Sequence, residues 1–133
     1  RAVYDALHVD CGMLSAASAA GSVRRAPEFV EVGGRPITKR FHVGGVPVAV
    51  ILFPPLPQGG RLNGDATPKL LASVLPRLMP SDAAIRIGIS PWGFEGEFAV
   101  REALEQRYHL LLGGGPGAAF AGEVNAQAPG LIW

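Results

Sequence analysis

Three short stretches of this 133-residue chain combine turn-forming residues with groups that could take part in chemistry. They are "DCGM" at 10–13, "SPWGFEGE" at 90–97 and "GGGPG" at 113–117. The first contains Cys11, whose thiol is a candidate catalytic group if its environment stabilises the thiolate. The third offers backbone N–H groups that could cradle an anion. The candidate ligand-facing residues of these loops are Trp92, Gly113, Gly114, Gly115 and Gly117.

Each of these stretches follows a segment that we expect to be a strand. "YDALHVD" (4–10) is typical of a short apolar strand, and "AAIRIGIS" (83–90) and "HLLLGG" (109–114) are typical of buried strands because their apolar character is nearly continuous. "FEGEFAVREALEQRY" (94–108) between them indicates a helix. The β-α-β order predicts that strands 83–90 and 109–114 are adjacent and parallel. Ligands bind where parallel strands end, so the three stretches are expected at one edge of a sheet.

The helix expected at 94–108 has one predicted apolar face. Its members are Phe94, Phe98, Ala99, Leu104 and Tyr108. Further helices are expected at "MLSAASAAGSV" (13–23) and from Thr67-Pro68 through "KLLASVLPRLM", where Pro76 should kink or end the helix.

The middle of the chain predicts a β-hairpin. "ITKRFHV" (37–43) and "VPVAVILF" (46–53) are rich in β-branched and aromatic residues and are separated by Gly44-Gly45, a two-residue turn signal. "FVEVGGRP" before them is expected to add a third strand.

Composition limits the class of protein. Twelve Lys and Arg against eleven Asp and Glu leave a formal charge of +1, with no basic run, so nucleic acid is a poor partner. Prolines cut the longest apolar stretch, "VPVAVILFPPLP", before it could span a bilayer. One cysteine excludes an internal disulfide and a cysteine-based zinc site. Because the chain begins with Arg1 rather than Met, we expect that an upstream piece has been removed.

Four segments taken in order resemble a known family. "YDALHVDCGML", "FHVGGVPVAVIL", "AAIRIGISPWGFEGE" and "YHLLLGGGPG" look like the central part of a calcineurin-like metallophosphoesterase domain of the 5′-nucleotidase and UDP-sugar hydrolase branch. The resemblance covers most of residues 4–117 and implies an α/β fold in which a layered sheet has flanking helices. The family's first metal motif lies upstream of the matched segments. Residues 1–133 are therefore expected to be a single domain with an incomplete core, an interior fragment of a larger 5′-nucleotidase-like domain.

The family holds two divalent metal ions with Asp, Asn and His on these loops, and there this chain departs from it. The residues at the matching ligand, catalytic and acidic positions are Cys11, Gly12, Met13, Pro91, Gly115 and Gly117. Apart from Cys11 as a thiolate, none is a usual ligand of such ions. We therefore expect no metal site and no cofactor.

Three functions follow from this comparison. The first is a non-hydrolytic scaffold or binding module, with a small phosphorylated or nucleotide-like molecule as its possible ligand. The second is a thiol-active or redox-active protein that uses Cys11 on the same fold. The third, a metallophosphoesterase hydrolysing phosphate esters, ranks last because its ligands are missing. The resemblance implies a periplasmic or extracellular location, but composition decides neither the compartment nor the oligomeric state.

The other polar residues have ordinary explanations. His8, His42 and His109 match no metal-binding spacing, so structural or exposed roles are expected. Glu95 and Glu97 could form a carboxylate pair, although acidic residues are favoured in a first helical turn by the helix dipole alone.

Overall fold

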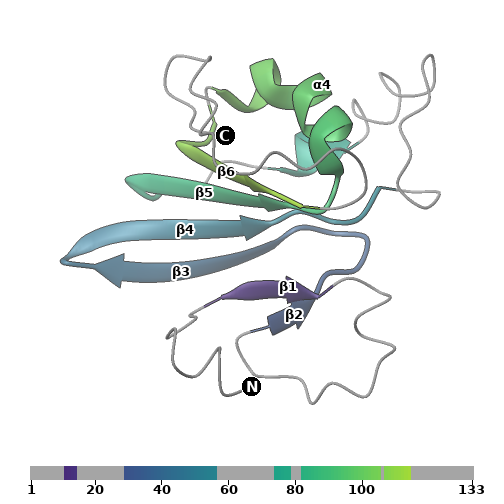
Figure 1. Cartoon of the computed structure of the whole chain (residues 1–133). Coiled ribbons are helices and arrows are strands. Elements are labelled where there is room, and N and C mark those ends of the chain that lie inside the picture. Colours follow the sequence, from purple (N-terminus) through teal and green to yellow (C-terminus); the bar gives the residue numbers. More distant parts are fainter. Residues whose placement is uncertain (1–10, 15–28, 57–73, 79–81, 106, 115–133) are drawn as a thin grey trace.

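The computed structural model describes residues 11–14, 29–56, 74–78, 82–105 and 107–114, which form an α/β structure around a mixed four-strand sheet (Figure 1). The strands are β3 (Ile37–Val43), β4 (Val46–Leu52), β5 (Ile85–Ser90) and β6 (Leu110–Gly113), and they lie in the sheet in this order. Strands β3 and β4 are antiparallel, whereas β4, β5 and β6 are parallel to one another. The general α/β class expected from the sequence is confirmed.

The hairpin predicted in the middle of the chain is β3 and β4. Val43 pairs with Val46, so the turn consists of Gly44 and Gly45 alone. Their φ angles are 57° and 82°, as a type I′ turn requires at both central positions. Pro47 follows on β4 and is tolerated there because pairing with β5 begins only at Val48.

The predicted β-α-β unit is also present. Strands β5 and β6 are adjacent and parallel, with Ile87 opposite Leu110, and α4 (Gly93–Glu105) connects them. Strand β6 is only partly buried, because Leu112 keeps 47% of its surface exposed.

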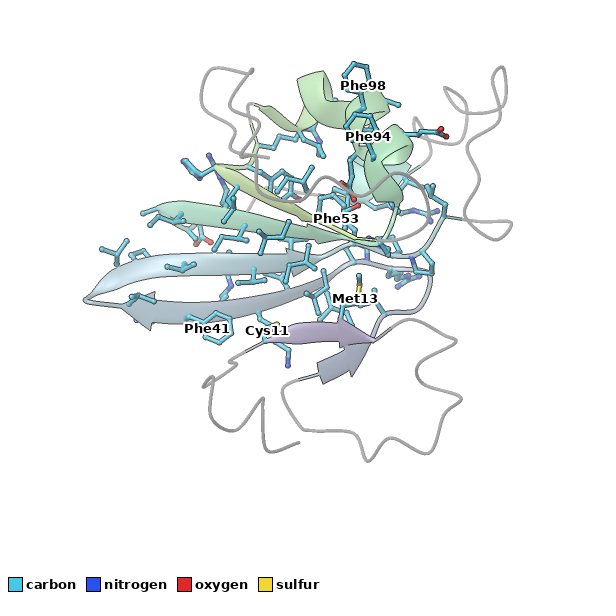
Figure 2. All side chains as sticks on the ribbon, in the orientation of Figure 1. Cys11, Met13, Phe41, Phe53, Phe94 and Phe98 are labelled. Carbon is cyan, nitrogen blue, oxygen red and sulfur yellow. The ribbon has the colours of Figure 1, made fainter. Side chains whose placement is uncertain are left out.

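Side chains alternate along β4 and bury both faces of the sheet. Ala49, Ile51 and Phe53 join an apolar cluster with residues of α4, and Figure 2 shows Phe53 between the sheet and this helix. Val50 and Leu52 belong to a second cluster on the other face. The buried positions of α4 include Val100 and Leu104.

The predicted face of α4 is therefore wrong in part. Leu104 is buried, as is Tyr108 beyond the helix end, but Ala99 is exposed and Phe98 keeps 47% of its surface exposed. Phe94 and Phe98 contact each other with ring centroids 5.9 Å apart (Figure 2).

The second face is covered by a short parallel pair, β1 (Gly12–Leu14) and β2 (Phe29–Glu31) (Figure 1). Residues 13–14 are thus strand, not the start of the helix expected at 13–23, whose remainder lies outside the described residues. Strand β2 is the expected third strand, but it pairs with β1 rather than with the hairpin. The strand expected at 4–10 also lies outside the described residues.

Of the helix expected after Pro68, only residues 74–78 are described. They contain a single 3₁₀ turn, Leu75–Arg77, that includes Pro76. None of the helices in the described ranges is both long enough and apolar enough to cross a membrane.

Among the described residues, Tyr108 is the largest side chain that is fully buried, with 1% of its surface exposed. Its ring packs edge-on against Phe53, with centroids 5.4 Å apart. The hydroxyl has no hydrogen-bond partner among the described residues. Burial raises the pKa of Tyr108 to about 12, although the positive charges of Arg107 and Arg86 act in the opposite direction.

The geometry of the turn predicts that any side chain at position 45 lowers the stability of the protein. Gly45→Ala should destabilise the protein by about 1–2 kcal/mol, because an alanine is strained at positive φ although nothing lies within 4 Å of its Cβ. Gly33→Ala is the matched control, since that position is equally open and no positive φ is recorded there. Urea unfolding measures both. Equal stability of the two variants would show that the turn does not hold the chain in this conformation.

The buried tyrosine predicts a loss of stability at high pH. Because the pKa of Tyr108 is raised from 10.0 to about 12 on folding, the native state keeps a proton that the unfolded chain releases. The free energy of unfolding should therefore fall as pH rises from about 10 to about 12, by at most about 1.4 kcal/mol per pH unit. Tyr108→Phe should flatten this part of the urea-unfolding profile. Superimposable profiles for Tyr108→Phe and the unmodified protein would contradict the assignment.

Candidate functional site

Backbone hydrogen bonds join the loops at the carboxyl ends of β5 and β6. The Gly114 N–H donates to the Ser90 carbonyl at 2.9 Å, and the Gly93 N–H donates to the Gly114 carbonyl at 3.0 Å. The Trp92 N–H donates to the Ser90 hydroxyl at 3.2 Å, and the Ser90 side chain is buried. These three N–H groups are therefore satisfied by neighbouring loop atoms.

Trp92 extends this network to the end of β4. Its indole N–H donates to the Pro54 carbonyl at 2.7 Å, and its ring lies 5.2 Å from that of Phe53. Only 3% of the residue is exposed. Trp92, expected to face a ligand, instead packs its side chain in the core and links the ends of β4 and β5.

Glu97 is a buried acidic residue near the carboxyl ends of β5 and β6, here called the carboxyl edge of the sheet. Only 3% of its surface is exposed. It comes from the first half of α4 and fills the space beside Gly113, the last residue of β6. A methyl group at position 113 would lie 2.7 Å from Cδ of Glu97 and closer still to Oε2. Glycine at this position is explained by the glutamate side chain above it, without any ligand.

The two glutamates expected as a possible pair have different environments. Glu95 lies in the first turn of α4 and is exposed, whereas Glu97 is buried. The positive end of the helix dipole favours carboxylates at both positions. The structure therefore separates the pair into a solvated surface charge and a buried packing group.

The sequence analysis did not single out Ser90, and it considered Glu97 only as half of a possible carboxylate pair. A signal for Glu97 was present, because it lies three and seven residues before Val100 and Leu104 and so shares their helical face. Ser90 is the last residue of β5, on the face opposite Ile89.

Cys11 lies away from the Glu97 site. It is partly buried and packs, with Met13, against the apolar cluster of Val50 and Leu52 on the β1/β2 face (Figure 2). Gly113 and Glu97 meet on the α4 side of the sheet. Strand β1 follows Cys11 directly, so Cys11 does not lie at the N-terminus of the helix expected at 13–23.

The described histidines have the ordinary roles that the sequence predicts. His42 and His109 are exposed, and Nδ1 of His109 accepts a hydrogen bond from the Arg86 N–H at 3.1 Å. Within the described ranges, no three His, Cys, Asp or Glu side chains lie together as metal ligands would. His8, Gly115 and Gly117 lie outside those ranges.

Comparison of the chain with protein-family models, with curated proteins and with solved structures found no match. The resemblance to metallophosphoesterases therefore remains an expectation from the sequence.

The contact between Glu97 and Gly113 predicts that alanine at 113 is costly. Gly113→Ala should destabilise the protein by about 1–3 kcal/mol, because the new methyl group overlaps the buried carboxylate. Gly114→Ala is the matched control and should be near neutral, since the nearest atom to its Cβ is the Ser90 carbonyl oxygen at 3.8 Å. Thermal or urea unfolding measures both variants.

A double-mutant cycle tests the cause. In a Glu97→Ala background, Gly113→Ala should cost much less than it does alone, because the overlapping atoms are gone. Additive effects of the two substitutions would mean that the glutamate does not determine the need for glycine at 113.

Proposed function

We propose that this chain is a 5′-nucleotidase-like and UDP-sugar-hydrolase-like α/β domain that does not hydrolyse phosphate esters and acts as a scaffold or binding module. The observation that carries the proposal is that the loops at the carboxyl edge bond to one another. Three loop N–H groups there, those of Trp92, Gly93 and Gly114, are bound to neighbouring loop atoms. Glu97 fills the space beside Gly113.

A phosphate cradle needs N–H groups that point at the ligand. The N–H of Gly114 donates instead to Ser90, so it does not serve as such a donor. The buried Glu97 side chain also fills the space beside the same loop. These features support a structural role for the carboxyl edge and not a hydrolytic one.

The thiol-based alternative receives no comparable support. Cys11 packs against an apolar cluster and precedes a strand, neither of which stabilises a thiolate. It is the second choice, and ordinary metallophosphoesterase chemistry remains the last.

Metal content and hydrolysis test the proposal together. Protein incubated with manganese, zinc or iron salts and then dialysed should hold no stoichiometric metal, because Gly12, Pro91, Gly115 and Gly117 stand at positions the resemblance assigns to ligands or catalysis. Hydrolysis of nucleotides, UDP-sugars and p-nitrophenyl phosphate should stay at the level of a no-protein blank, with an active phosphoesterase as positive control. Nucleotide binding without hydrolysis would favour the binding module over the scaffold.

The contrary result is equally clear. Elemental analysis near one metal ion per chain, lost in His8→Ala or His109→Ala and accompanied by hydrolysis, would overturn the proposal. Full hydrolytic activity in Glu97→Gln would then show that hydrolysis does not take place at the carboxyl edge.

A further inference from the structure

Two hydrogen-bond donors lie buried at the opposite edge of the sheet, where β5 and β6 begin. They are Nε of Arg86, on β5, and the hydroxyl of Tyr108, just before β6. Neither has an acceptor among the described residues. A buried donor that lost its water without gaining a partner is costly, so two of them in one region call for an acceptor.

Both donors lie on the α4 side of the sheet. Ile87 and Ile89 of β5 belong to the cluster on the β1/β2 side, so the alternating residues Arg86 and Gly88 face α4. Gly88 lies beneath the Phe53 ring, which in turn packs against Tyr108.

Backbone contacts fix the two segments against each other. The His109 N–H donates to the Arg86 carbonyl at 2.9 Å, and the Arg86 N–H donates to Nδ1 of His109 at 3.1 Å. Tyr108, the preceding residue, is thereby held close to Arg86.

The region carries positive charge. In the described part of the chain no carboxylate pairs with Arg86, although its side chain is partly buried. Arg107 is the second cation, and its Nη1 donates to the Leu75 carbonyl at 3.4 Å. Both guanidinium groups lie close enough to Tyr108 to act on its pKa. Within the described ranges, this partly buried guanidinium has no counter-ion and the nearby hydroxyl has no acceptor, a combination that suits an oxyanion.

We propose that the amino ends of β5 and β6 bind a small oxyanion, through a phosphoryl or carboxylate group that accepts hydrogen bonds from Arg86 Nε and the Tyr108 hydroxyl. The hydroxyl is a donor at neutral pH, as a tyrosine is even at its ordinary pKa of about 10. The C-terminal end of α4 carries about half a negative unit charge, which repels an anion. Among the described side chains, Arg86 and Arg107 each contribute a full positive charge near Tyr108. The site lies at the other edge from Glu97 and is independent of the function proposed above.

Thermal unfolding of the full chain in increasing sodium phosphate, and separately in sodium acetate, tests this site at constant pH and ionic strength set with chloride. One of the two oxyanions should raise the midpoint temperature of unfolding, and the rise should saturate with anion concentration, as it does for a bound ligand. Arg86→Gln should weaken the apparent affinity about tenfold or more, and Tyr108→Phe by a smaller factor. Arg35→Gln, at an exposed arginine, is the matched control and should leave the curve unchanged.

Tyr108→Phe also separates binding from folding. Without the anion this variant should be as stable as the unmodified protein or more so, because it removes a buried hydroxyl that has no partner in the described ranges. A midpoint temperature that rises linearly with anion concentration in all variants would overturn the proposal, because this is the general effect of salts excluded from the protein surface. So would the absence of any rise, since a bound water would then account for both donors.

Discussion

The register of β4 is the constraint on which the rest of the structure depends. This strand is hydrogen-bonded on both edges, to β3 and to β5, and carries apolar side chains on both faces. A slip of one residue would exchange the two faces, moving Phe53 away from α4 and Leu52 toward it. Each such side chain contributes about 1.5–3 kcal/mol by burial, so register and layer arrangement stabilise each other.

The two edges of the sheet differ in how their polar groups are satisfied. At the carboxyl edge the loops bond to each other through Ser90, Trp92 and Gly114, and Glu97 closes the remaining space. At the amino edge Arg86 and Tyr108 bury donors that have no acceptor in the described ranges. At the edge where the topology predicts a ligand, the N–H groups of Trp92, Gly93 and Gly114 are therefore already bonded within the loops, whereas the two buried donors lie at the opposite edge.

The elements predicted correctly are those whose signal is local. Continuous apolar runs predicted β4 and β5, and two adjacent glycines predicted the turn between β3 and β4. The face of α4 was harder, because Glu97 interrupts the apolar stripe that Val100 and Leu104 continue, while Phe98 adds an apolar residue outside it. Strand β1, with three residues, is too short to show a period. The surroundings of Cys11 and the glutamate above Gly113 depend on residues distant in sequence, so no local pattern could predict them.

The order of the four strands in the sheet is also their order along the chain. Each strand thus lies beside the one that precedes it, first across a two-residue turn and last across a single helix. No strand has to be inserted between two already paired neighbours. The entropy lost in closing each loop is set by the length of one connection, and it grows only slowly with that length. The sheet can therefore assemble from the β3/β4 hairpin by adding β5 and then β6, one strand at a time, with its most local contacts formed first.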